Sequence, residues 1–179
     1  MGIEIERRFL VDGRNDKPWR TGKSSTMFQC YLKNVTHIDG KIMWNGNLLV
    51  EEERTLSNLT TWRIRLSDDT VVLTAKGRRI GATAAEYQWN LSPELYNSLP
   101  LDGLPSVEKI RHYWTGVDGL VWEVDEFEGS IAGLIIAEVE LDKEDQEVVL
   151  PEWAGLELTN LSGWSNSSLS RMIKDSELN

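Results

Sequence analysis

Hydrophobic and polar residues alternate along short segments of the chain, at the two-residue period that is typical of β-strands. We expect strands near residues 3–11, 26–33, 60–66, 70–76, 84–91, 107–114, 120–127 and 134–141. Turn signals separate several of these segments, among them Ser67-Asp68-Asp69 and Asp118-Gly119. A succession of mostly antiparallel strands indicates a mainly β fold, either a barrel or a sandwich.

Helical signals are fewer, so the predicted fold class is mainly β (α+β) with a few covering helices. Ser92-Pro93-Glu94 combines a capping residue, a first-turn proline and an acidic side chain, and predicts a short helix that ends near Leu99. A second helix is expected from Ser165 to Lys174.

A long connection over roughly residues 34–60 is predicted to be a hairpin-like insertion, because Asn45-Gly46 stands between two apolar runs. It either elaborates the surface in contact with solvent or alters the mouth of a site or a partner surface. No linker or low-complexity run divides the chain, so residues 1–179 are expected to form a single domain.

The polar faces of the predicted strands carry charges, often two of the same sign two residues apart. In "IEIERRFLV", at residues 3–11, Glu4, Glu6 and Arg8 share one face with Leu10. The other cationic positions are Arg63, Arg65, Lys76, Lys109 and Arg111, and the other anionic ones are Glu86, Glu123, Asp125, Glu138 and Glu140. Like charges side by side repel, so this pattern is costly unless groups of opposite charge lie between the strands.

A closed sheet with these faces inward would have a charged lumen. Clustered carboxylates fit a hard divalent cation, and clustered guanidinium and ammonium groups fit phosphate. A polyphosphate chelated by Mg²⁺ or Mn²⁺ would satisfy both sets. Two simpler readings stay open at this point, a barrel filled with structural salt bridges and an outer face in water. A barrel for an apolar ligand does not fit so many charges.

Composition narrows the partners and the compartment. The formal net charge of −10 argues against general binding to nucleic acid or an anionic membrane. Cys30 is the only cysteine, so no internal disulfide forms and a reducing compartment is expected. The N-terminal segment is charged and has no apolar core of a signal peptide, and no stretch approaches the length of a membrane span. We therefore expect a cytoplasmic protein.

The ordered fragments of the chain resemble one family. They are "EIERRFLV", "RIR", "LTAKG", "EYQW", "EKIRHYW", "WEVDEFEG", "AGLIIAEVEL" and "SNSSL". Together they resemble the CYTH superfamily, the triphosphate tunnel metalloenzymes, over nearly the whole chain apart from residues 34–60. The sequence of the late fragments is similar to that of the bacterial inorganic triphosphatase branch. The resemblance implies an eight-stranded antiparallel closed barrel, whose tunnel holds a triphosphate and requires a divalent metal.

The resemblance also implies roles for individual residues. The metal ligands would be the carboxylates of Glu4, Glu6, Glu86, Glu138 and Glu140. The substrate would be bound by Arg63, Arg65, Lys76, Lys109 and Arg111, with Ser165 and Asn166 from a helix beside the tunnel. The catalytic group would comprise Arg8 with Glu123 and Asp125, which would orient the basic residues or a metal-bound water.

Three positions depart from the family pattern. Arg8 stands where the family has a lysine, and an arginine stays protonated, so it binds or orients but does not accept a proton. Gln88 and Asn90 replace residues that are often carboxylates, which weakens the hold on one metal. These departures bear on how fast the protein would turn over a triphosphate.

The first functional hypothesis is hydrolysis of inorganic tripolyphosphate to pyrophosphate and phosphate, with Mg²⁺ or Mn²⁺. Nucleoside or thiamine triphosphates and adenylyl cyclase chemistry stay open, because residues outside the tunnel select what is attached to the phosphates. The second hypothesis is a triphosphate-binding regulatory module with weak catalysis. The expected partner is a small polyphosphate or triphosphate, and a homodimer stays open because the chain has eight tryptophans.

Overall fold

The computed structural model describes residues 2–178, and strands dominate them. Eight of the strands are long and carry the predicted alternation. They are β1 (Gly2–Val11), β2 (Ser24–Leu32), β6 (Leu59–Ser67), β7 (Thr70–Gly77), β8 (Thr83–Leu91), β9 (Ser106–Thr115), β10 (Val121–Phe127) and β11 (Ile135–Glu140). Each corresponds to one of the predicted segments, with ends that differ by one or two residues.

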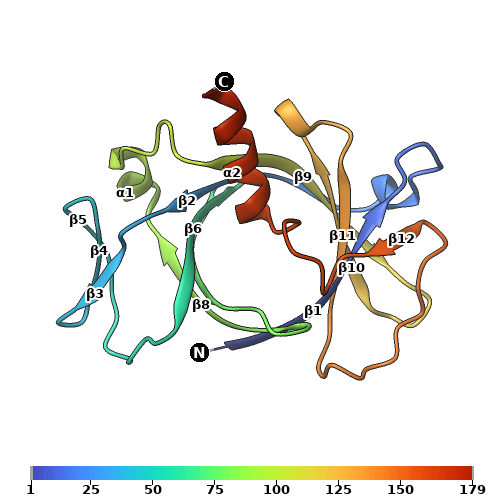
Figure 1. Cartoon of the computed structure of the whole chain (residues 1–179), viewed down its shortest axis with the longest axis horizontal. Coiled ribbons are helices and arrows are strands. Elements are labelled where there is room, and N and C mark those ends of the chain that lie inside the picture. The colour runs from blue at the N-terminus through green and yellow to red at the C-terminus, as the bar shows by residue number, and fades with distance from the viewer. Residues whose placement is uncertain (1, 179) are drawn as a thin grey trace.

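These eight strands form a closed ring (Figure 1). They pair antiparallel in the order β11-β10-β9-β2-β6-β7-β8-β1, and β1 pairs with β11 to complete the circle. The expected eight-stranded antiparallel closed barrel is therefore confirmed. Closure removes the exposed edges that an open sheet would present and gives every strand one face toward a common interior.

A short strand, β12 (Ala154–Glu157), adds to β1 outside the ring and was not expected from the sequence. It has only four residues, too few for alternation to be visible. Gly155 is required there, because a side-chain Cβ at this position would lie 2.5 Å from the carbonyl oxygen of Leu10.

The insertion packs against the outer wall of the barrel. Its strands β3 (Thr36–Ile38), β4 (Lys41–Trp44) and β5 (Asn47–Glu51) form a separate three-stranded antiparallel sheet. Asn45 and Gly46 make the β4–β5 turn, and both have the positive φ that such a two-residue turn requires. Ile42 and Leu49 are buried among the outward apolar residues of β6, β7 and β8. The insertion thus covers the apolar side of the wall.

Tryptophans cover the opposite part of the outer wall. Trp19, in the 3₁₀ turn η1 (Pro18–Thr21), meets Trp153 edge to face with ring centroids 5.0 Å apart. Trp153 also contacts Trp114 and Trp122 of the β9–β10 hairpin at 5.3 and 5.6 Å. The predicted apolar faces of these strands therefore lie outward, under loops.

The two predicted helices are present. Helix α1 (Pro93–Ser98) is capped by Ser92, whose Oγ accepts a hydrogen bond from the Leu95 amide. Helix α2 (Asn166–Glu177) is capped in the same way by Ser165. No helix within residues 2–178 combines the length and the apolar character needed to cross a membrane.

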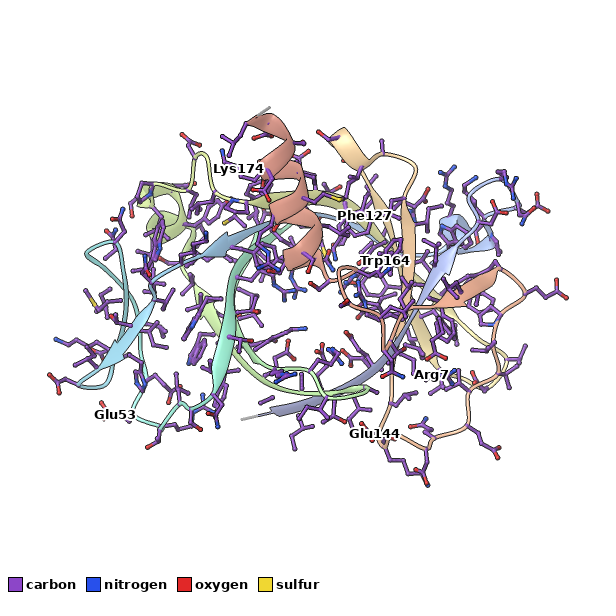
Figure 2. The ribbon with its side chains drawn as sticks, viewed as in Figure 1. Arg7, Glu53, Phe127, Glu144, Trp164 and Lys174 are labelled. Carbon is purple, nitrogen blue, oxygen red and sulfur yellow. The ribbon has the colours of Figure 1, made fainter. Side chains whose placement is uncertain are left out.

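Helix α2 closes one end of the barrel. Leu169 of α2 packs with Val107, Phe127 and Ile136, which are inward-facing residues at the adjoining strand ends, and with Leu158. Figure 1 shows one end of α2 at the edge of the ring, beside β2 and β9, and Figure 2 shows Phe127 and Trp164 beside its base. The short 3₁₀ turn η2 (Gly129–Ile131) contributes Ile131 to the same cluster. The interior is thus apolar at the α2 end and charged over the rest of its length.

Candidate active site in the barrel lumen

A cavity of about 440 Å³ occupies the charged part of the lumen. Polar side chains from the strands project toward the centre of the ring in Figure 2. Among the predicted residues, the cavity is lined by Glu4, Glu6, Arg8, Arg63, Arg65, Lys76, Glu86, Lys109, Arg111, Glu123, Glu138, Glu140, Ser165 and Asn166. The remaining one, Asp125, is fully buried behind the lining residues. The structure thus brings the predicted site residues together in one place.

Strand register explains this convergence. Glu6 pairs with Glu140 and Arg8 with Glu138 across the β1–β11 seam that closes the barrel. Residues that pair directly across two strands point to the same face, so each inward position brings its partner inward. On β2 the inward positions are uncharged, and Tyr31 lies opposite Arg63.

The β6 wall carries positive charge without a carboxylate partner. Arg63 donates a hydrogen bond from Nη2 to the Thr74 hydroxyl at 3.2 Å, and in residues 2–178 neither Arg63 nor Arg65 lies within ion-pair distance of an acid. The Nε atoms of both arginines are buried and have no hydrogen-bond partner. Burial lowers the pKa of Arg65, and the charges of Arg63 and Arg111 add to this effect. An unpaired, desolvated cation is costly, so this wall is suited to an anionic ligand.

A second basic group is held by Asp125. Lys109 Nζ lies 2.6 Å from Asp125 Oδ2, and Arg111 Nε lies 2.8 Å from Asp125 Oδ1. Burial would raise the pKa of Asp125, but Arg111 and Lys109 hold it below its usual value. Burial also lowers the pKa of Lys109 to about 8, with Arg111 adding to the shift. Asp125 therefore fixes the direction in which Lys109 and Arg111 point.

Glu123 stands on the same strand as Asp125 but reaches the cavity. Its Oε2 lies 2.5 Å from Arg111 Nη1. Burial raises the pKa of Glu123 despite this ion pair, and repulsion from Glu138 adds to the rise. A carboxylate with a raised pKa at a cavity wall is suited to exchange protons with a bound water.

The wall opposite β6 carries carboxylates that repel one another. Burial raises the pKa of Glu6 well above its ordinary value, and the charges of Glu138 and Glu4 raise it further. Burial, Glu4 and Glu86 raise the pKa of Glu140 in the same direction. The wall therefore holds more negative charge than its cationic neighbours neutralise.

Arg8 connects this acidic wall to helix α2. Its Nε donates to Glu138 Oε1 at 3.1 Å, and its Nη1 donates to the Trp164 carbonyl at 3.0 Å. Its Nη2 is buried and has no partner. The α2 terminus is also held on the other side, where Lys109 Nζ donates to Asn166 Oδ1 at 3.1 Å.

Arg79 was missed by the sequence analysis, although it lines the cavity. It lies in the β7–β8 loop, so strand alternation gives no indication of where its side chain points. Its Nη2 lies 2.8 Å from Glu4 Oε2 and 2.9 Å from Glu6 Oε1. Tyr31 and Tyr113 also line the cavity and were not predicted, because the pattern that indicated the site was one of charged residues. The "KGRR" run next to a strand end was the only signal for Arg79.

The acidic wall has the donor chemistry of a divalent-metal site but not a preformed cluster. Among residues 2–178, no three His, Cys, Asp or Glu side chains are grouped closely enough to hold a metal ion. Lys76 Nζ lies 2.8 Å from Glu4, and the Arg79 guanidinium bridges Glu4 and Glu6. The carboxylates of this wall are oxygen donors that repel one another, and a hard cation such as Mg²⁺ or Mn²⁺ would bind them and relieve the repulsion. The inward carboxylates that could hold such an ion, once Lys76 and Arg79 release them, are Glu4, Glu6, Glu86, Glu138 and Glu140.

Comparisons with known proteins agree with this fold and site. Residues 47–173 match the model of the CYTH domain. The chain is 31% identical over 172 residues to the inorganic triphosphatase of Acetivibrio thermocellus, covering 94% of each protein. It is 31% identical over 96 residues to the inorganic triphosphatase of Nitrosomonas europaea, covering 52% of this chain and 64% of that protein. The crystal structure of the inorganic triphosphatase NE1496 superposes with a TM-score of 0.59 at 25% identity, covering 95% of each chain.

The fold and the site together define a class of protein: closed β-barrels with a charged lumen. The chain belongs to the CYTH family.

Proposed function

We propose that this protein hydrolyses a triphosphate inside the barrel lumen, and that its substrate is inorganic tripolyphosphate, cleaved to pyrophosphate and phosphate with Mg²⁺ or Mn²⁺. The single observation that carries this proposal is the β6 wall. Arg63 and Arg65 face the cavity with buried N–H groups that have no acceptor, opposite a wall of carboxylates. The inorganic triphosphatases at 31% identity support the same substrate class.

In this proposal the basic residues position the phosphates. Arg63, Arg65 and Arg111 would bind non-bridging oxygens along the chain, since phosphoryl transfer depends mostly on positioning and on neutralising charge. Asp125 supports this by holding Lys109 and Arg111 in fixed directions. Arg8 cannot accept a proton, so its role is to bind phosphate through its free Nη2.

The bond changes are those of a simple hydrolysis. A water oxygen forms a bond to a terminal phosphorus, and the bond from that phosphorus to the bridging oxygen breaks. We assign Glu123 to accept one proton of the water, because its pKa is raised and it faces the cavity. The pyrophosphate leaves with the electron pair of the broken bond, and the positive charges of the arginines stabilise it.

Glu4, Glu6, Glu138 and Glu140, with Glu86, would hold the divalent cation in this proposal. The ion supplies neutralisation of phosphate charge and activation of water. The proposed ligands are inward-facing carboxylates whose mutual repulsion a cation would relieve.

A phosphate-release assay tests the proposal. The purified protein is incubated with tripolyphosphate, ATP or thiamine triphosphate, each in Mg²⁺, Mn²⁺ or EDTA. We expect turnover of tripolyphosphate with metal, and its loss in Glu6→Gln and Arg65→Ala. Tight tripolyphosphate binding without turnover would instead identify a triphosphate-binding module. Preferential turnover of one of the other two substrates would reassign the substrate within the triphosphates.

A further inference from the structure

Arg79 is the only cation of the described cavity wall that comes from a loop and contacts two carboxylates at once. Its Nη2 lies 2.8 Å from Glu4 Oε2 and 2.9 Å from Glu6 Oε1. Its Nη1 donates to the carbonyl of Ala82, the residue immediately before β8. The three contacts direct the guanidinium into the lumen from the rim of the barrel.

A small residue lies opposite Glu4, the carboxylate that Arg79 contacts. Ala84 occupies an inward position on β8, directly across from Glu4 in the β1–β8 register, and it lines the cavity. A longer side chain at Ala84 would fill the space above Glu4. The sequence thus provides an empty inward position and a loop arginine that reaches into it.

The attachment of Arg79 differs from that of Lys76, which also contacts Glu4. Lys76 lies on β7, and its backbone is fixed by pairing with Thr61 and Glu86 on the two neighbouring strands. Arg79 lies in the connection between β7 and β8, where Ile80 is three-quarters exposed and a single bridge joins Ile80 to Thr83. The guanidinium is therefore held by the carboxylates and by one carbonyl, not by a packed core.

We propose that Arg79 binds the substrate, and that it holds Glu4 and Glu6 until a divalent cation takes these carboxylates. This inference rests on the proposed function. A cation and a guanidinium compete for the same carboxylate oxygens, and a buried guanidinium beside a divalent ion loses its favourable partners. The triphosphate is the anion within reach, so Arg79 exchanges its carboxylate contacts for phosphate contacts. The β7–β8 loop thereby links occupation of the acidic wall to capture of the substrate.

The exchange predicts opposite effects of one substitution on two ligands. Removing the Arg79 guanidinium frees Glu4 and Glu6, so the metal alone binds more tightly. It also removes a phosphate contact, so the triphosphate binds more weakly. An arginine with a purely structural role would weaken both or change neither.

The first measurement is a calorimetric titration of MnCl₂, without phosphate, into the full-length wild-type protein and Arg79→Gln. We expect Mn²⁺ to bind Arg79→Gln about tenfold more tightly, the ratio that corresponds to one lost charge-assisted hydrogen bond. Arg14→Gln is the matched control, because it removes the same charge from an exposed arginine paired only with Asp12. Its Mn²⁺ affinity is expected to equal that of the wild type.

The second measurement is the KM for tripolyphosphate at saturating Mn²⁺, which we expect to rise about tenfold in Arg79→Gln. Arg79→Lys keeps the charge and serves as a second variant, with intermediate values for both ligands. Circular dichroism of each variant checks that it is folded. Equal or weaker Mn²⁺ binding by Arg79→Gln and Arg79→Lys, relative to the wild type, overturns the inference.

The two proposals fail in different ways. If the wild type does not hydrolyse tripolyphosphate but Arg79→Gln binds Mn²⁺ more tightly, the proposed function fails and the competition at Glu4 and Glu6 stands. If the wild type is active and Mn²⁺ binds Arg79→Gln and Arg14→Gln equally, the function stands and the role of Arg79 is wrong.

Discussion

At the scale of single residues, the lumen contains two kinds of cation. Lys109 and Arg111 are paired with Asp125, whereas Arg63 and Arg65 have no carboxylate within ion-pair distance in the part of the chain that the structure describes. Paired cations stabilise the fold, because removing one leaves a buried acid without its partner. Unpaired, partly buried cations cost folding free energy, so in the proposed function Arg63 and Arg65 serve phosphate binding and not stability. Substitutions in the two groups should therefore differ.

Arg65→Gln tests the unpaired kind. We expect kcat/KM for tripolyphosphate to fall about ten- to a hundredfold, the loss of one hydrogen bond to a charged group. We expect the free energy of unfolding to stay the same or to rise, since a desolvated charge is removed. Urea unfolding and steady-state kinetics measure the two effects. Arg111→Gln is the control, and its unfolding free energy should fall, because Asp125 loses one of its two cationic partners and Glu123 loses its own. A clear loss of stability in Arg65→Gln would contradict the distinction.

Lys109 should make the activity of the site depend on pH. Burial lowers its pKa to about 8, so it is protonated and able to neutralise phosphate below this pH and loses its charge above it. We therefore expect kcat/KM for tripolyphosphate to decline as the pH rises through about 8. Lys109→Arg should move the decline to higher pH, because arginine keeps its proton. A pH–rate profile of both proteins measures this, and identical profiles would contradict it.

A substitution of Arg8 can distinguish its contribution to stability from its contribution to the reaction rate. A lysine at this position cannot reach both Glu138 and the Trp164 carbonyl, so Arg8→Lys should lose about 1 kcal/mol of unfolding free energy. The control is Arg7→Lys, since Arg7 faces outward to Glu157. A higher kcat in Arg8→Lys would show that arginine limits the rate, and unchanged stability would show that it is no anchor.

At the scale of elements, the strands and their charged faces were predictable, because alternation reports directly on the two sides of a sheet. Three features were not. Arg79 lies in a loop, where no period applies, and the inward side of β2 is uncharged, so a search for charge passes over Tyr31. The apolar end of the lumen was hidden because Val107 and Phe127 continue inward faces that are otherwise charged. Each depends on three-dimensional contacts between distant segments.

Helix α2 should stabilise the barrel by filling this apolar end. Leu169 is buried there, so Leu169→Ala is expected to lower the free energy of unfolding by about 2–5 kcal/mol. Met172, on the exposed side of α2, is the matched control, and Met172→Ala should change the unfolding free energy by less than about 0.5 kcal/mol. Urea denaturation measures both, and equal effects would show that α2 does not close the barrel.

At the scale of the whole molecule, a net charge of −10 coexists with a lumen that carries arginines without carboxylate partners. The barrel separates the two, because the wall keeps the clustered arginines away from the acidic outer surface. General attraction of polyanions to the outer surface is thereby disfavoured. The lumen also neutralises itself in part, through the contacts of Lys76 and Arg79 with Glu4 and Glu6.

Metal removal tests this self-neutralisation. We expect EDTA to abolish tripolyphosphate hydrolysis while the far-ultraviolet circular dichroism spectrum stays that of a β protein. The melting temperature should fall only by the amount that ligand release implies, and added Mg²⁺ or Mn²⁺ should restore activity. Loss of the β spectrum in EDTA would contradict the expectation, because it would make the ion part of the fold.

The tryptophans provide a last consequence. Trp19, Trp44, Trp62, Trp89, Trp114, Trp122 and Trp153 pack in the outer clusters, whereas Trp164 belongs to the cluster at the inner end of the lumen. Intrinsic fluorescence is therefore dominated by indoles that lie outside the cavity. A red shift of this fluorescence would report unfolding of the outer clusters. Trp164 is linked to the lumen through its backbone carbonyl, which accepts a hydrogen bond from Arg8, so its indole is the one expected to respond when the cavity is occupied. Any fluorescence change on adding tripolyphosphate is therefore expected to come from this residue, and Trp164→Phe should remove it.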